Sequence, residues 1–173
     1  MVGSMGKIAL GLLLLSLGAG CASSCDDRAD HRKAPGFRVD LPERARSVIE
    51  QAEVVEILAL SPETVTDGGA LDVFHTHRVL GRATLDEPDR RALADLLLTD
   101  IGNHKSTMVA CNEPHHGFRF TRGADEHVDL VMSFGCLHGT LFEAQRRTTV
   151  LTSAERKPKL DTLFAKYKLA SGK

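Results

Sequence analysis

A run of ten mostly apolar residues, Ile8 to Leu17, stands near the N-terminus of this 173-residue chain. A helix needs about 20 apolar residues to cross the hydrocarbon core of a bilayer, so this run is too short to span one. Its length suits the apolar core of a secretory signal peptide, and the single cation before it, Lys7, suits the start of such a peptide. No later segment is apolar enough to span a membrane, so the sequence divides into a leader and a part that folds.

Small residues follow the apolar run and end at a cysteine, in the order Gly18-Ala19-Gly20-Cys21. This arrangement resembles the lipobox of bacterial lipoproteins, and the resemblance covers residues 1–21 only. It implies that the thiol of Cys21 receives a diacylglyceryl group, that the chain is cut before it, and that the new amino terminus is acylated. Gly18 departs from the pattern, because an aliphatic residue is commoner there. An ordinary cleaved signal peptide with a chance cysteine is the alternative.

The resemblance implies a water-soluble domain held at a membrane surface by several acyl chains. The residue after the cysteine is Ala22 and not Asp, which in that family, for a bacterium with two membranes, implies the outer membrane, facing the periplasm. We therefore expect a signal peptide over residues 1–20, a lipidated N-terminus and polar tether over 21–39, and one domain over 40–173.

Charge and composition exclude some classes of partner. The chain has 22 Lys and Arg against 23 Asp and Glu, which argues against a nucleic-acid binder. It has no Trp and one Tyr, which argues against an aromatic carbohydrate platform. An apolar content of 42% is that of a globular domain.

Hydrophobic periodicity predicts three helices, each with a start signal. The first follows a potential capping box, Asp40-Leu-Pro-Glu43, and the second follows Asp86-Glu-Pro-Asp89. The third begins at about Lys157 or Pro158, because proline is tolerated only in the first turn.

Strand patterns lie between the helices, mostly one after another with short links. They cover residues 53–60, which read as an interior strand, then 72–84, 107–112, 116–122, 127–135 and 139–151. Phe118 and Phe120 should share a core face with Leu130 and Met132 across a turn at 123–125. We expect an α+β fold, with an antiparallel sheet of about five or six strands and helices packed on one face.

Four cysteines and eight histidines are present, and Cys111 and Cys136 flank the predicted hairpin almost symmetrically. Disulfides persist outside the cytoplasm, so these two are a candidate pair. An unbroken ladder would place them on opposite faces, although Asn112-Glu-Pro114 could break it.

Metal ligation is a second interpretation of the same region, with zinc or copper as the metal. His75 and His77 stand two apart on a predicted strand and would point the same way. The full candidate set is His75, His77, Cys111, His115, His116, Cys136 and His138. The spacings do not match a zinc finger or ribbon.

Catalysis is a third interpretation, with Cys111 as nucleophile and His115 as base. No oxyanion-hole motif, G-x-S-x-G, H-E-x-x-H or phosphate loop accompanies them, so we expect no catalytic residues and no cofactor. A basic run near the C-terminus is typical of a solvated helix face, and contact with anionic lipid or polymer is its functional alternative, weakened by Glu155 and Asp161; the run is Arg156, Lys157, Lys159, Lys166, Lys168 and Lys173.

The leading hypothesis is a non-enzymatic, membrane-anchored envelope lipoprotein with a binding or structural role. Its partners would be the membrane, through the lipid, and an envelope protein or anionic polymer. The alternative is a periplasmic Cys/His metal-binding or redox protein.

Overall fold

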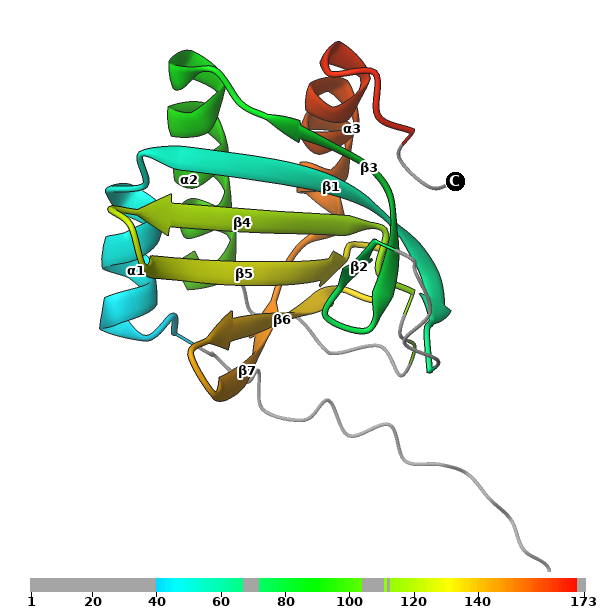
Figure 1. The fold of residues 1–173 in the computed structure, drawn as a ribbon, viewed down its shortest axis with the longest axis horizontal. Helices are drawn as coiled ribbons and strands as arrows, with labels where there is room; N and C mark the ends of the chain where they lie inside the picture. Colours follow the sequence, from blue (N-terminus) through cyan, green and yellow to red (C-terminus); the bar gives the residue numbers. More distant parts are fainter. Residues whose placement is uncertain (1–39, 67–71, 104–110, 112, 171–173) are drawn as a thin grey trace, which may run out of the picture. The chain divides into compact units, whose positions relative to one another are not determined.

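A seven-stranded antiparallel sheet forms the centre of the domain in a computed structural model of the chain (Figure 1). The structure describes residues 40–66, 72–103, 111 and 113–170. Its elements are α1 (Glu43–Glu50), β1 (Val54–Thr64), β2 (Val73–Phe74), β3 (His77–Thr84), α2 (Glu87–Asn103), β4 (His116–Arg122), β5 (Glu126–Ser133), β6 (His138–Glu143), β7 (Arg146–Leu151), the 3-10 turn η1 (Ala154–Arg156) and α3 (Lys157–Lys166).

The strand order is β2-β3-β1-β4-β5-β6-β7, and every neighbouring pair is antiparallel. The α+β class is therefore confirmed. β1 lies between β3 and β4 and is buried on both faces from Ile57 to Leu60, as predicted for an interior strand. Phe118 pairs with Leu130, which confirms the predicted register of the central hairpin.

The prediction of five or six strands is wrong, because two predicted strands are hairpins. Residues 72–84 turn at His75-Thr76, and residues 139–151 turn at Ala144-Gln145. Neither turn contains glycine, the usual signal for a two-residue hairpin loop. His75 and Ala144 adopt positive φ angles of 56° and 49° instead. The predicted strand at 107–112 lies mostly outside the described residues, and Cys111 is not in a strand.

The helices begin close to the predicted points. Asp86 caps α2 by accepting a hydrogen bond from the backbone N–H of Asp89, and α3 begins at Lys157. The capping box expected at Asp40 is wrong: α1 begins at Glu43, with Pro42 at the N-cap and no side-chain cap bond. In the described part of the chain, no helix is long and apolar enough to cross a membrane.

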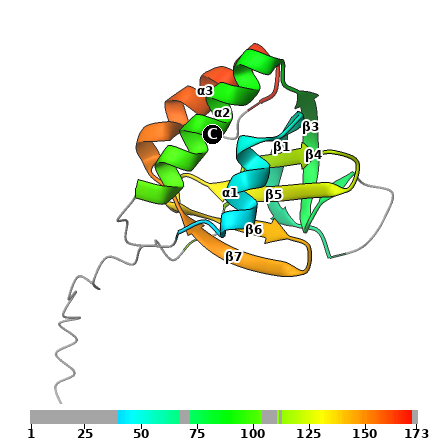
Figure 2. The ribbon, with the colours of Figure 1, turned by 90° about the vertical axis from the view of Figure 1, so that its left-hand side faces the viewer.

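Alternating side chains divide the sheet residues between two faces. The first face carries Ile57, Phe118 and Leu130, which belong to one buried cluster with residues of all three helices, among them Val48, Leu97 and Phe164. Figure 2 shows α2 and α3 next to each other, and β7 at the lower edge of the strands. The second face carries a smaller apolar cluster of Leu58, Leu60, Phe74 and Val131.

Candidate functional site

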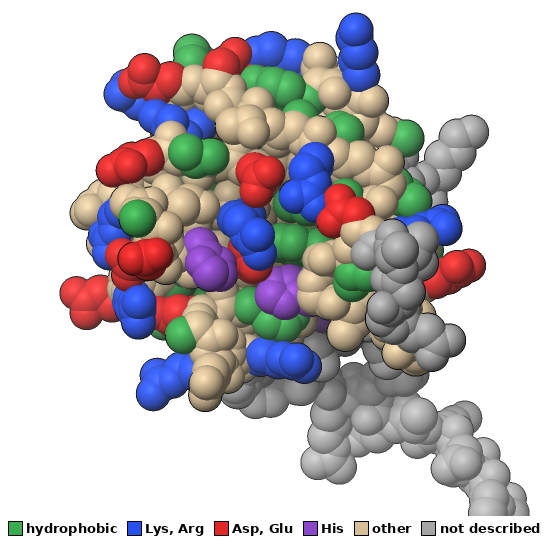
Figure 3. Space-filling view, viewed as in Figure 1, with side chains coloured by type: hydrophobic (Ala, Val, Ile, Leu, Met, Phe, Trp, Pro, Cys, Tyr) green, Lys and Arg blue, Asp and Glu red, His purple; other side chains and the backbone are tan. Residues whose placement is uncertain are grey.

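The second face carries charged and histidine side chains among its apolar residues (Figure 3). Arg119 on β4 lies directly opposite Asp129 on β5, and Asp129 lies opposite Phe142 on β6. Successive residues of a strand point to opposite faces, so these three side chains emerge beside one another, away from Phe118 and Leu130.

Asp129 is the centre of this group and is only 2% exposed. Arg119 donates two hydrogen bonds to it, each 2.8 Å long, in the forked geometry that guanidinium and carboxylate favour. His75 Nε2 lies 2.9 Å from Asp129 Oδ2. Burial acts to raise the pKa of Asp129, but the hydrogen bonds from Arg119 and His75 outweigh it, so this pKa lies below its ordinary value. The carboxylate is therefore charged and satisfied.

Aromatic rings enclose the group. The His75 imidazole stacks on Phe142, with 3.6 Å between the ring centroids and 11° between the planes. The Arg119 guanidinium lies 5.2 Å from the centroid of Phe74, and that of Arg147 lies 5.5 Å from the centroid of Phe142.

The β2–β3 turn reaches this position because β1 bends. The pairing of β1 with β3 shifts register twice, after Ala59 and again after Leu60, and such irregularities bend a strand. Phe74 then lies over Gly117 of β4, where a Cβ atom would come within 3.1 Å of the Phe74 ring. The absence of a side chain at Gly117 thus lets the turn and His75 approach the sheet.

A cavity of about 190 Å³ adjoins the group, and we call it the histidine cavity. Residues from the β2–β3 turn and from β3, β5, β6 and β7 line it, together with Pro114. Its described lining residues are Thr76, His77, Pro114, Val131, Ser133, His138, Gly139, Thr140, Phe142 and Arg147. They include one permanent cation, two imidazoles and three hydroxyl groups, and none is an acid.

His77 and Ser133 are the buried polar residues of the described cavity lining, with 5% and 2% of their surfaces exposed. The Nδ1 of His77 is buried and has no hydrogen-bond partner in the described part of the chain. Burial lowers the pKa of His77 below the ordinary 6.5, although hydrogen bonding with the backbone of Ser61 and Glu63 opposes the shift. The ring is therefore neutral near pH 7 and retains an unused nitrogen.

His138 lies across the cavity on β6, next to the covalent cross-link. Its Nδ1 is 3.0 Å from the carbonyl oxygen of Cys136. Cys136 forms a disulfide with Cys111, and the two Cα atoms are 5.5 Å apart. Neither cysteine lies in a strand, so the register of the ladder does not separate them. Ser133 also donates a hydrogen bond to the carbonyl oxygen of Glu113, next to Pro114 of the cavity wall.

The structure divides the seven metal candidates among several places. His77 and His138 share the histidine cavity, and Cys111 and Cys136 form the disulfide. The expectation that His75 and His77 lie on one strand is wrong, because His75 is in the β2–β3 turn, where it contacts Asp129, and His77 begins β3. Within the described residues, no three His, Cys, Asp or Glu side chains form a group that could hold a metal ion.

The other two histidines lie apart from the cavity lining. The Nδ1 of His115 is buried without a hydrogen-bond partner, immediately before β4. His116 is 1% exposed and packs edge-on against Phe134 and Phe164. Burial lowers the pKa of His116 to about 4, and its Nε2 is 3.6 Å from Asp161 Oδ1, beyond normal hydrogen-bond length.

Sequence reasoning missed Arg119, Asp129, Phe142 and Arg147. One signal was present: the register that places Phe118 opposite Leu130 also places Arg119 opposite Asp129. Comparisons of the chain with protein-family models, curated proteins and solved structures give no match.

Proposed function

We propose that this chain is a lipid-anchored protein of a bacterial cell envelope whose domain binds an anionic envelope component. The anchor rests on the lipobox-like residues ending at Cys21. In this proposal the helices pack on the first face of the sheet, and the second face is the one presented to the partner. The role is binding and not catalysis.

One observation carries the binding proposal: the histidine cavity combines a cation with unused polar groups and has no acid among its described lining residues. Arg147 forms no ion pair in the described part of the chain, whereas Arg119 is bound to Asp129. Guanidinium groups favour carboxylates and phosphates, and the hydroxyls of Thr76 and Thr140 add hydrogen-bond donors, whereas His77 Nδ1 donates only when its ring is protonated. A carboxylate or phosphate group of an anionic polymer fits this donor set.

Binding of such an anion is tested by isothermal titration of the purified chain in detergent with inorganic phosphate. The variant Arg147→Gln should weaken binding by about tenfold, since hydrogen bonds to charged groups contribute about 1.5 to 3 kcal/mol. Arg146→Gln is the matched control: it removes the same charge from the neighbouring position, whose side chain points to the other face of β7. Equal losses of phosphate affinity in both variants would show only a general effect of charge and would contradict a site at Arg147.

A zinc or copper site on His77 and His138 is the second candidate. Metal-binding histidines use one ring nitrogen for a backbone carbonyl or carboxylate and the other for the metal. His138 has this pattern with Cys136, and His77 with the backbone of Ser61 and Glu63. Titration with zinc chloride separates the candidates: a metal site would be lost in His138→Gln and kept in Arg147→Gln.

Anchoring is tested separately with Cys21→Ser. The variant should lose uptake of radiolabelled palmitate and globomycin-sensitive processing. Several acyl chains anchor a protein stably, whereas a single chain binds only marginally. Palmitate incorporation that persists in the variant would contradict the assignment of Cys21.

A further inference from the structure

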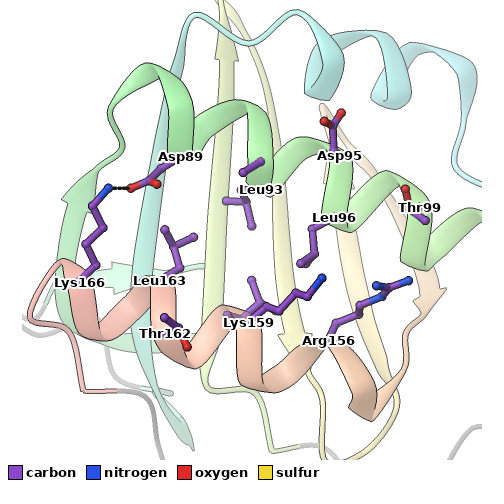
Figure 4. Close-up of a pocket in the computed structure, with 12 residues that line it drawn as sticks. Asp89, Leu93, Asp95, Leu96, Thr99, Arg156, Lys159, Thr162, Leu163 and Lys166 are labelled. Carbon is purple, nitrogen blue, oxygen red and sulfur yellow. Dashed lines mark hydrogen bonds and ion pairs between the residues drawn. The ribbon is translucent and has the colours of Figure 1, made fainter.

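A groove of about 520 Å³ runs between α2 and α3 and shares no lining residue with the histidine cavity (Figure 4). Four leucines form its apolar part: Leu93 and Leu96 from α2, and Leu160 and Leu163 from α3. Leu93 and Leu160 are buried, while Leu96 and Leu163 are partly exposed. The volume lies within the range of about 300 to 1,000 Å³ typical of pockets for small organic ligands.

Charge is distributed unequally along this groove. At one end Lys166 is neutralised, with its Nζ 2.5 Å from Asp89 and 3.4 Å from Asp86. At the other end Lys159 is exposed and forms no ion pair in the described part of the chain. Arg156 lies beside it, and its Nε is buried without a hydrogen-bond partner.

The acids nearest this cationic end do not neutralise it fully. Asp100 Oδ1 lies 3.6 Å from Arg156 Nε and offsets part of its charge, while Thr152 and the backbone N–H of Ser153 donate hydrogen bonds to Asp100 Oδ2; Lys159 has no such partner among the described residues. Asp95 lines the groove but points away from α3 (Figure 4). The groove therefore has one positive end and an apolar length.

We propose that this groove binds one long-chain fatty acid, with the carboxylate at Lys159 and Arg156 and the chain along the leucines toward Lys166. The lining residues of α2 run from Asp89 to Thr99, about 15 Å at a rise of 1.5 Å per residue. An acyl chain spans half of a hydrocarbon core about 30 Å thick, which is the same length. A ligand with one anionic end matches the distribution of charge better than a protein helix does.

The test is titration of the full chain with sodium palmitate, with native mass spectrometry to count bound molecules. Lys159→Glu should weaken palmitate binding by about tenfold, because it replaces an attraction by a repulsion. Lys168→Glu makes the same change in charge outside the groove lining and should alter the affinity by less than about twofold. The N-terminal segment is identical in all variants, so a difference in palmitate affinity between them is due to the groove.

Two further arms complete the test. Hexadecyltrimethylammonium has an apolar chain with a cationic end. It should bind the unsubstituted chain more weakly than palmitate does, and it should bind Lys159→Glu more tightly than palmitate does. If Lys159→Glu fails to fold, as judged by circular dichroism, Lys159→Gln replaces it. Equal palmitate affinity in Lys159→Glu and Lys168→Glu would overturn the proposal. It would also be overturned if Lys159→Glu abolished a dimer of the chain without changing palmitate binding.

Discussion

His75 Nε2 lies 2.9 Å from Asp129 Oδ2, which joins the β2–β3 turn to the middle of β5 across the second face of the sheet. The same turn carries Thr76, and His77 follows it as the first residue of β3; both line the histidine cavity. Asp129 is in turn fixed by two hydrogen bonds from Arg119. The wall of the cavity is therefore held in place by a buried carboxylate that is not itself part of the lining.

Asp129→Asn should lower the free energy of unfolding by about 1 to 3 kcal/mol. Removing one partner of a buried ion pair lowers stability more than removing one partner of an exposed pair. Because Asp129 is buried and Arg119 is partly exposed, the loss of stability should lie between these two cases. Urea denaturation measures it. Asp72→Asn breaks the exposed pair with Arg82 and should cost about 1 kcal/mol or less. Similar losses in the two variants would contradict a special role for Asp129.

Gly117→Ala should lower the free energy of unfolding by about 1 to 2 kcal/mol, since the added methyl group meets the Phe74 ring and must displace it. Gly135→Ala is the control, because a Cβ atom there meets nothing within 4 Å. We expect the control to change stability by less than about 0.5 kcal/mol. Thermal unfolding of both variants measures the difference, and equal stability would show that the turn does not approach β4 so closely.

The cross-link between Cys111 and Cys136 predicts matched effects of two variants. Cys111→Ala and Cys136→Ala should each destabilise the domain by about 2 to 4 kcal/mol, because each opens the same loop in the unfolded chain. The double variant should cost little more than either single one. Thiol alkylation of the unfolded, unreduced protein followed by mass spectrometry checks the bond directly. Alkylation of both Cys111 and Cys136 in the unsubstituted chain would exclude the disulfide.

His116 predicts a dependence of stability on pH. Its pKa is lowered to about 4 in the folded protein by burial, so between about pH 6.5 and pH 4 only the unfolded chain takes up a proton there. As the pH is lowered through this window, the free energy of unfolding should fall by about 1.4 kcal/mol per pH unit, or about 3 kcal/mol in all. The pKa of Asp129 lies below its ordinary value, so that group titrates mainly below the window.

Urea denaturation at several pH values, compared between the native chain and His116→Leu, isolates this contribution. The variant should lose the part of the slope that extends down to pH 4, while the lowered pKa of His77 leaves a smaller slope just below pH 6.5. His127→Leu changes an exposed histidine and should keep the slope. An unchanged slope in His116→Leu would show that another group is responsible.

Sequence patterns could predict the central hairpin because its apolar residues alternate regularly and its turn contains Gly123. The same register contains the Arg119–Asp129 pair, so the sequence pattern could also have predicted this ion pair. The positions of His75 and Phe142 could not be predicted, because they depend on turns at His75-Thr76 and Ala144-Gln145, which have no glycine signal. The bend of β1 that brings the first of these turns over the sheet depends on tertiary pairing, which periodicity does not report.

Titration with inorganic phosphate, followed by NMR of the ¹⁵N-labelled imidazole groups, tests the proposed binding site most directly. Phosphate should shift and saturate the signals of His77 and His138 and leave those of His116 and His127 unchanged. The response should be lost in Arg147→Gln and kept in Arg146→Gln. Absence of any shift at His77 and His138, or equal shifts at all four histidines, would contradict an anion site in the histidine cavity.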